Sequence, residues 1–454
     1  MKYRKWLAGV ALVGAISLVG AACSSNKAST SPSGGNTGAC NDKFGCVTIK
    51  PGEPFHFGAI QTVSQSTAAL GTDEIHGIQL AMDYLDGKFD TKPGQLLGHA
   101  VTLTTGDETD PTSGQCGKSG GQTAATKLAA DSSIVAVIGT SCSSSALGVS
   151  DTILGNKGII LVSASNTSAK LTNPQFHNPF YFRTAQNDAI QAKVVADFVF
   201  TKLGIKSAAT MNDGGPYTAG LTGGFEGFYK GLGGTITASE TFDPTLKDFK
   251  PVLTSIAQGH PGVIYAPDFD PPCALIAIQM AQVPALSGVK FVGSDGCNES
   301  TFYKLAKSNA TASYVYLSSP KPSPGATTAL FTEEQAAYKA QYGNPTASFN
   351  SNAFDAFNII VQAIKSVVIK QSDGTLLIPR TALKNAMYKI KDYQGITGPL
   401  TCISTGDCQS QVAVNIAVYQ GADGPFAPGK SPTTATVFYN ETFSLQQALA
   451  GGST

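Results

Sequence analysis

The sequence lacks an excess of charge of either sign. Its 454 residues contain 31 Lys and Arg and 31 Asp and Glu, and only 14% of the chain is charged. A chain with no basic surplus has no overall field that attracts nucleic acid or an anionic membrane surface. We therefore expect no nucleic-acid partner, and any charged ligand must be met by local groups.

Metal-ligand patterns are scarce as well. No C-x-x-C pair occurs, and the histidines are few and scattered. Metal sites in proteins need such side chains at close, regular spacings. We therefore expect no metal and no other cofactor. The five histidines are His56, His76, His99, His177 and His260.

Signals of catalysis are few. No histidine stands beside a serine cluster in a recognisable arrangement. No G-x-G-x-x-G occurs, and "CGKS" (116–119) is not a phosphate loop, because Thr112 stands where that loop needs its first glycine. We expect the protein not to be an enzyme.

Long hydrophobic runs are missing except near the N-terminus. There, basic residues precede an apolar run over 6–19 and small residues up to Cys23, which is the pattern of an export signal. The tract that follows, "SSNKASTSPSGGNTGA", is too polar to fold. We expect a signal peptide over residues 1–22 and an anchor cysteine with a flexible linker over residues 23–50.

The N-terminal pattern resembles a bacterial lipoprotein signal, in which the box "GAAC" is cut before Cys23 and this cysteine is acylated. Gly20 departs from the apolar residue usual in that box, and plain cleavage by ordinary signal peptidase is the alternative. The resemblance implies an extracytoplasmic protein held at the cell membrane by lipid on Cys23.

Cysteine usage agrees with export. Removing Cys23 leaves an even number of cysteines, which suggests disulfides in an oxidising compartment. Eight cysteines allow 105 connectivities, and the sequence alone does not choose among them. The eight are Cys40, Cys46, Cys116, Cys142, Cys273, Cys297, Cys402 and Cys408.

From residue 54 onward, short β-rich runs alternate with helical patterns. Runs such as "IVAVIG" and "GIILVSA" are continuously apolar, which is typical of a parallel sheet covered on both faces. The alternation restarts after residue 185. The sequence therefore predicts an α/β protein with two lobes, each an open, mostly parallel sheet with helices on both faces.

Three short extended segments are predicted to cross between the lobes, forming a multi-strand hinge. They lie at residues 180–185, 313–319 and 395–401. These crossings assign residues 51–183 plus 320–396 to the first lobe and residues 184–319 plus 397–454 to the second. Ligands of such sheets bind at the carboxyl ends of the strands.

One strand end is rich in hydroxyls: "GTSCSSSALGVSD" (139–151) directly follows an apolar run. Loop serines commonly cap the helix that follows. Hydroxyls and backbone N–H groups at such a helix start also bind anions. Both interpretations stay open for Ser143, Ser144 and Ser145.

Several segments, in this order, resemble the branched-chain amino-acid binding proteins of bacterial ABC importers, which have the Leu/Ile/Val-type periplasmic-binding-protein fold. They are "VIGTSCSSS", "GIILVSASNTSAKLT", "FYFRT", "NDGGPYTAG", "FVGSDG" and "NAFDAFNII". The resemblance implies a monomer that closes around a small polar solute, with an amino acid expected, and delivers it to a membrane permease. A ligand-sensing module of the same fold, or a binder of an amide, urea or small aromatic acid, is the alternative.

The resemblance also implies site residues. Ser143, with Ser144 beside it, and Ser165 and Thr167 would receive the solute carboxylate. In the second lobe, Tyr217 would contact the solute and the carboxylate of Asp295 would receive its ammonium. A helix cap is the alternative role for Asp295. Leu70 stands where the family often has an aromatic wall, and either Asp268 or Phe269 faces the solute. Leu70 and the Asp268–Phe269 position both differ from the family's pattern at the side-chain pocket, so the preference for a branched-chain amino acid stays open.

The same resemblance implies one disulfide pair and suggests a second. The family has a disulfide linking the regions of Cys116 and Cys142, and Cys273 and Cys297 repeat that arrangement in the second lobe. Two further pairs, Cys40–Cys46 and Cys402–Cys408, would close small local loops. Buried free thiols are the alternative for any pair.

Overall fold

A computed structural model of the chain describes residues 39–326, 328–444 and 446–447. The predicted signal peptide and Cys23 lie outside these residues, as does the first part of the predicted linker. Within the described ranges, no helix combines the length and hydropathy needed to cross a bilayer.

The sheet of the first lobe is parallel, with the strand order β3-β2-β4-β5-β6. Its strands are Phe55–Gln61 (β2), Val101–Asp107 (β3), Ile134–Gly139 (β4), Leu161–Ser163 (β5) and Tyr181–Arg183 (β6). The helices of this lobe are Ala68–Asp83 (α1), Lys118–Ala129 (α2), Ser143–Ser145 (α3), Asp151–Gly155 (α4), Thr328–Tyr342 (α10), Asn350–Val367 (α11) and Arg380–Met387 (α12).

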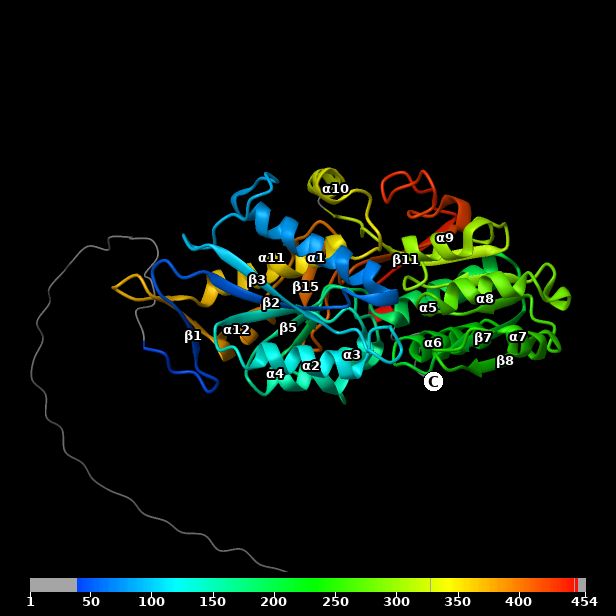
Figure 1. Ribbon diagram of the computed structural model, residues 1–454, viewed down its shortest axis with the longest axis horizontal. Helices are drawn as coiled ribbons and strands as arrows, with labels where there is room; N and C mark the ends of the chain where they lie inside the picture. The colour runs from blue at the N-terminus through cyan, green and yellow to red at the C-terminus, as the bar shows by residue number, and fades with distance from the viewer. Residues whose placement is uncertain (1–38, 327, 445, 448–454) are drawn as a thin grey trace, which may run out of the picture. The chain divides into compact units, whose positions relative to one another are not determined.

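Helices cover both faces of this sheet (Figure 1). Strand β4 is buried on both of these faces. Val137 belongs to the apolar cluster under α2 and α4, whereas Ala136 and Ile138 belong to the cluster under α1 and α11. Side chains alternate between the faces of a strand, so a strand buried on both faces is apolar throughout. The continuous apolar run of β4 is thus a direct consequence of its central position.

The sheet of the second lobe has the order β18-β17-β11-β10-β9-β7-β8, parallel except at β17 and β18. Its strands are Ser207–Asn212 (β7), Thr235–Thr241 (β8), Val263–Tyr265 (β9), Lys290–Gly293 (β10), Val315–Lys321 (β11), Val414–Gln420 (β17) and Tyr439–Phe443 (β18). Its helices are Asp188–Asp197 (α5), Thr218–Gly231 (α6), Lys250–Ala257 (α7), Pro272–Met280 (α8) and Ser300–Ala306 (α9).

The second sheet is also buried on both faces. Ile264 of β9 packs in the cluster under α7, α8 and α9, while Val263 and Tyr265 pack in the cluster with α5 and α6. The predicted fold class, two α/β lobes with mostly parallel sheets covered on both faces, is confirmed.

Two small sheets correct the predicted lobe boundaries. Cys46–Ile49 (β1), expected as linker, pairs with Leu376–Pro379 (β13), which also pairs with Ile369–Lys370 (β12). Pro399–Cys402 (β15), expected in the second lobe, joins Tyr393–Gln394 (β14) and Cys408–Gln409 (β16), and its Leu400 belongs to the core of the first lobe. The first lobe therefore begins before residue 50 and extends to about residue 409.

Three crossings connect the lobes. The chain passes from β6 to α5, returns from β11 to α10, and passes again from β16 to β17. The first two lie next to the predicted segments. The third follows Gln409 and not residues 395–401, because β15 and β16 still belong to the first lobe.

Close backbone contacts fix α1 against its neighbours. A Cβ on Gly71 would lie 2.1 Å from the carbonyl oxygen of Thr62, and one on Gly77 would lie 2.1 Å from that of Asn350. Only glycine allows α1 to approach β2 and α11 this closely. This contact brings Leu70, near the start of α1, beside Phe349, which precedes α11.

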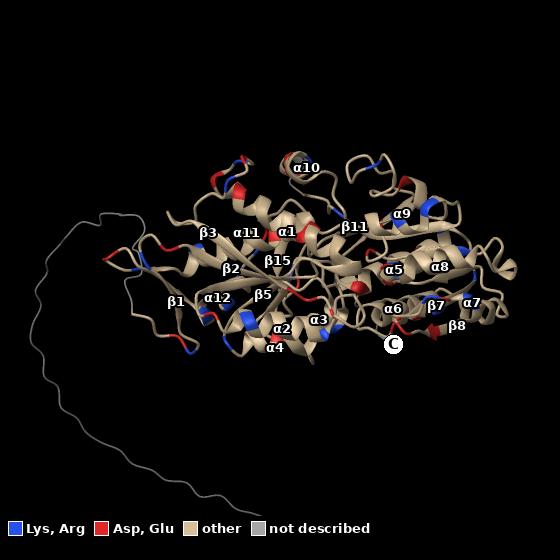
Figure 2. Ribbon diagram, viewed as in Figure 1, with Lys and Arg blue, Asp and Glu red and all other residues tan. Residues whose placement is uncertain are grey.

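Charged residues are interspersed along the ribbon. Figure 2 shows Lys and Arg, and Asp and Glu, scattered over the described elements on a ribbon that is mostly uncharged. This distribution agrees with the balanced composition of the sequence.

Candidate functional site

A small cavity lies where strand ends of the two lobes meet. Six of the eight predicted site residues line it. The first lobe contributes Leu70, Ser141, Ser143, Ser165 and Phe349, and the second contributes Tyr217, Phe269, Asp295 and Gly296.

The lobes are close together at this cavity. The hydroxyl of Ser168, in the first lobe, donates to the carbonyl oxygen of Pro216, in the second, at 2.9 Å. The remaining volume is about 10 Å³, roughly the room of one water molecule. Entry of an amino acid therefore requires the lobes to move apart.

Tyr217 and Asp295 form the polar wall of the second lobe. The Tyr217 hydroxyl donates to Oδ1 of Asp295 at 3.1 Å and accepts from the N–H of Gly296 at 3.0 Å, with the Ser294 hydroxyl 2.7 Å away. The Tyr217 ring also contacts Phe269, with the centroids 5.1 Å apart. Phe269, and not Asp268, lines the cavity.

Asp295 is a buried carboxyl group and does not cap a helix. The helix that follows it, α9, begins after Glu299, four residues further on. Burial raises the pKa of Asp295 to about 6, although nearby Gln191 and Tyr217 lower it. Asp188, at the start of α5, is a second buried acid here, and its pKa is raised well above normal by burial and by Asp295. Both groups favour a cation beside them.

The serines of the first lobe form a connected polar wall. Ser165 Oγ donates to the carbonyl oxygen of Ser141 at 2.8 Å, and Ser143 Oγ accepts from the N–H of Ser168 at 3.2 Å. Each of these hydroxyls lines the cavity and retains capacity for a ligand. Ser144, which is half-buried, does not line the cavity.

The capping interpretation of these serines is wrong. The predicted helix after "IVAVIG" is broken at Leu147 and Gly148, so α3 is only one short turn. Its N-cap residue is Cys142, which makes no side-chain cap hydrogen bond. A helix this short supplies no substantial dipole for a carboxylate.

The Glu108 carboxylate binds two backbone N–H groups of the loop that follows β4. Its Oε1 accepts from the N–H groups of Ser141 and Cys142, at 2.7 and 3.0 Å. Burial raises the pKa of Glu108 to about 8, and the pKa of buried Glu74, 2.9 Å from Ser141 Oγ, is also raised well above normal. A solute carboxylate would therefore be met mainly by hydroxyls and not by these two N–H groups.

Thr167 is fully buried but does not line the cavity. Its carbonyl oxygen accepts from the N–H of Asp188, and its side chain lies beside the Asp188 carboxyl. Arg183 fixes the loop that carries Thr167, because its Nη1 donates to the carbonyl oxygens of Asn166 and Ser168 on either side of Thr167.

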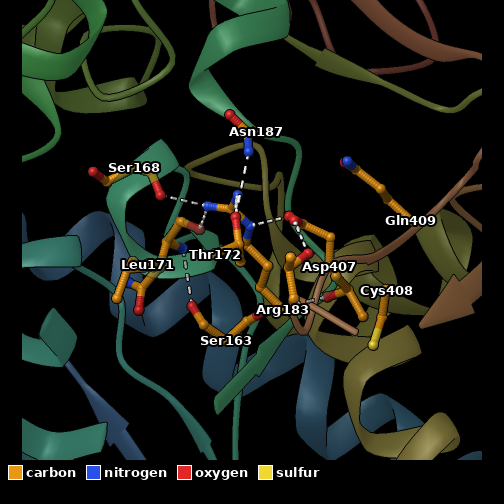
Figure 3. Close-up of polar contacts among 12 residues, drawn as sticks. Ser163, Ser168, Leu171, Thr172, Arg183, Asn187, Asp407, Cys408 and Gln409 are labelled. Carbon is orange, nitrogen blue, oxygen red and sulfur yellow. Dashed lines mark hydrogen bonds and ion pairs between the residues drawn. The ribbon is translucent and has the colours of Figure 1, made fainter. Parts of the chain in front are cut away.

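Arg183 is itself fixed by a buried ion pair. Figure 3 shows its guanidinium between Asp407 on one side and Thr172 on the other. The Nε–Oδ1 distance to Asp407 is 2.7 Å, Nη2 donates to Thr172 Oγ1 at 2.7 Å, and both charged side chains are almost fully buried. This pair joins the first crossing to the residues just before the third.

The apolar wall comes from Leu70 and Phe349, with Phe269 opposite. Leu70 was predicted to replace an aromatic wall. The structure supplies an aromatic ring from Phe349 instead. Sequence reasoning missed Phe349, which lies in none of the quoted segments. It also gave no role to Ser141 and Gly296, although they lie inside "VIGTSCSSS" and "FVGSDG".

In the structure the eight cysteines form the four disulfides that were expected. Cys116–Cys142 and Cys273–Cys297 join loops at the strand ends beside the cavity, and Cys40–Cys46 and Cys402–Cys408 close short loops. Glu108 lies near the sulfurs of Cys116 and Cys142, but these sulfurs are bonded to each other. They offer no thiolate to a metal.

One serine pattern does carry the spacing of a hydrolase elbow. Residues 117–121 read "GKSGG", which fits G-x-S-x-G. A nucleophile elbow is a sharp turn directly after a strand. Here Ser119 lies inside α2, well after β3, and its hydroxyl donates to Asp110, so the pattern does not form an elbow.

Residues 54–425 match the family described as periplasmic binding protein. The chain belongs to this family. Among curated relatives, the Leu/Ile/Val-binding protein BraC3 of Rhizobium johnstonii is 28% identical over 355 residues, covering 78% of this chain and 89% of that protein. A Leu/Ile/Val-binding protein homologue of Brucella melitensis is 25% identical over 78% of this chain and 88% of that protein.

Solved periplasmic binding proteins share the fold. A leucine-binding protein of Thermotoga maritima aligns with a TM-score of 0.70 at 20% identity, covering 86% of this chain and 99% of that one. A Rhodopseudomonas palustris solute-binding protein in complex with benzoate aligns at 0.68, with 16% identity, over 86% and 98%. The relatives are binding proteins and not enzymes, as expected, and the family is extracytoplasmic.

Proposed function

We propose that this periplasmic binding protein binds an amino acid between its lobes and delivers it to an ABC permease. The observation that carries the proposal is the buried carboxyl of Asp295, held by Tyr217 and facing the hydroxyls of Ser143 and Ser165 across one cavity. A carboxylate on one wall and hydroxyl donors on the other complement the ammonium and carboxylate of a zwitterion.

Further support comes from relatives. The named curated relatives are Leu/Ile/Val-binding proteins, and an aligned structure from Streptococcus pneumoniae holds isoleucine. The apolar wall of Leu70, Phe269 and Phe349 suits an aliphatic or aromatic side chain. Binding then stabilises a closed arrangement, because only that arrangement lets the solute contact both lobes.

A ligand screen tests this function. We expect a thermal-shift screen over amino acids, amides, urea and small aromatic acids to single out an amino acid, since binding only to the folded state raises its stability by RT ln(1 + [L]/Kd). Small-angle scattering should then show contraction on saturation. Stabilisation by benzoate or urea alone would reject the amino-acid assignment, and an unchanged radius at saturation would reject closure.

We further propose that Cys23 carries the lipid that holds the protein at the membrane, as the sequence pattern implies. Replacing Cys23 with Ser should move the protein from the membrane fraction to the medium or periplasm, or stall its processing, as followed by cell fractionation. Retention of a processed Cys23→Ser protein on the membrane would contradict the anchor. A Ser24→Ala variant is the matched control and should remain attached.

A further inference from the structure

The segment that supplies Phe349 to the proposed amino-acid site is held by one buried carboxyl group. Asp73 lies in α1 and is fully buried. Its Oδ2 accepts from the N–H groups of Phe349 and Asn350, at 3.2 and 2.9 Å, and its Oδ1 accepts from the N–H of Thr346 at 3.3 Å. We call residues 346–350 the wall segment, because Phe349 lines the cavity.

These bonds complete the N-terminus of α11 from another helix. The first N–H groups of a helix have no partner within it. Phe349 is the N-cap residue of α11 and makes no side-chain cap hydrogen bond, and Asp73 receives its N–H and that of Asn350 instead. A carboxylate at this end is also favoured by the helix dipole. Since α1 and α11 lie side by side (Figure 1), Asp73 fixes where α11 begins relative to α1.

Side-chain donors bind the same carboxylate. The Tyr338 hydroxyl, in α10, donates to Oδ1 of Asp73 at 2.9 Å, and Nδ2 of Asn350 lies 3.1 Å from both oxygens. Burial raises the pKa of Asp73 to about 6, although Tyr338 and Asn350 lower it, so the group is mostly ionised at neutral pH. An ionised carboxylate accepts at both of its oxygens, which a carboxamide cannot do.

The wall segment contacts the second lobe at two points. Phe349 and Phe269 line the same cavity and belong to one apolar cluster. The carbonyl oxygen of Thr346 accepts from the N–H of Ser300, the first residue of α9, at 2.9 Å. Ser300 follows the loop that carries Asp295. A displacement of the wall segment would therefore change both the apolar wall and the contact between the lobes.

We propose that Asp73 is a positioning residue for side-chain selectivity: by holding the wall segment, it places Phe349 against the apolar side chain of the bound amino acid. This inference rests on the proposed function. Asp73 does not line the cavity, so it acts through Phe349 and not by touching the solute. A hydrophobic pocket discriminates by the methylene groups that it packs, so a small amino acid gains little from this placement.

Asp73→Asn tests the proposal, because it turns one of the two acceptors into a donor that faces other donors. Hydrogen exchange followed by mass spectrometry should show about tenfold faster exchange, or more, in a peptide spanning residues 345–352. Calorimetry then compares alanine with leucine or phenylalanine, whichever of these two binds more tightly. We expect the preference for the larger amino acid to fall by about fivefold or more, while the affinity for alanine changes by less than about twofold.

Further variants separate positioning from a general loss of stability. In a Phe349→Ala background, Asp73→Asn should leave the selectivity unchanged, because the side chain through which it acts is already absent. Asp83→Asn is the matched control. Asp83 is 5% exposed and accepts from Nε2 of Gln341 at 3.4 Å, so it also joins α1 to α10, but at the end of α1. It should change neither the exchange of the wall segment nor the selectivity.

The outcomes distinguish this inference from the proposed function, which the ligand screen judges separately. Unchanged exchange of the wall segment in Asp73→Asn overturns the positioning role, whatever the protein binds. Faster exchange with unchanged selectivity, or an equal loss of affinity for alanine and the larger amino acid, overturns the role in selectivity. A wild type that prefers neither leucine nor phenylalanine to alanine, or binds none of them, does the same. If Asp73→Asn does not fold, Tyr338→Phe, which removes one donor, should shift both measurements in the same direction by about twofold, and no shift there overturns the inference.

Discussion

Replacing Asp295 with alanine is expected to weaken amino-acid binding by roughly 30-fold or more. Removing one partner of a desolvated charge pair costs about 2–5 kcal/mol of binding. Asp295 is 4% exposed and lines the cavity, so an ammonium beside it would lose its main counter-charge. Calorimetry with the best amino acid from the screen measures the loss.

A nearby acid provides the control for this prediction. Glu299 is 3% exposed and lies in the same loop, but it does not line the cavity. We expect Glu299→Gln to change affinity less than threefold, or about 0.6 kcal/mol. An Asp295→Ala loss below about tenfold would contradict the ammonium role and favour a solute without an amino group.

Because the carboxyl of Asp295 is buried, we also expect the affinity for the amino acid to depend on pH. The pKa of Asp295 is raised to about 6 by burial, so the proton competes with the ammonium of the solute below that pH. Affinity should be constant above pH 7 and fall by up to about tenfold per pH unit below about pH 6. The neighbouring acid Asp188 titrates in the same surroundings, so Asp295→Asn, which removes one titration, shows which group is responsible.

Removing one member of the Arg183–Asp407 pair is expected to lower the free energy of unfolding by about 3–5 kcal/mol. Both side chains are almost fully buried, so Arg183→Met leaves a charged Asp407 without its partner, and Asp407→Leu does the reverse. The double variant should lose less than the sum of the two single losses, because it leaves neither charge unpaired. Urea unfolding measures all three.

An exposed ion pair is the matched control. Lys430 lies 3.4 Å from Asp423 at the surface, and Lys430→Met should cost less than about 1 kcal/mol. Strict additivity of the two buried single variants would contradict an interaction between Arg183 and Asp407.

The alternation of strands and helices was predictable because it rests on local patterns. Strands such as β4 and β9 are short and apolar throughout, and the helices between them keep one apolar face. The boundary errors have a different origin. β1 pairs with β13, and β15 packs in the first core, through contacts with residues far along the chain. Four residues such as Cys46–Ile49 carry no sign of a distant partner.

The candidate site was predictable in its composition and less so in its geometry. The resemblance pointed to Ser143, Tyr217 and Asp295, and these line one cavity. The role of the serines as caps failed because Gly148 breaks the helix and the loop donates instead to Glu108, a residue of another segment. Phe349 reaches the cavity only because α11 packs closely on Gly77 of α1.

Strand β18 affects how the molecule behaves toward other copies of itself. It pairs with β17 over five residues at one edge of the second sheet, and it lies beyond residue 425, where the family match ends. A sheet edge with unpaired N–H and C=O groups is a template for strand addition and aggregation. Without β18, the apolar strand Val414–Gln420 would present such an edge to solvent. Strand β18 is now the edge of the sheet, and its half-exposed sequence "YNETF", with the acidic Glu441, takes the place that the apolar β17 would otherwise have.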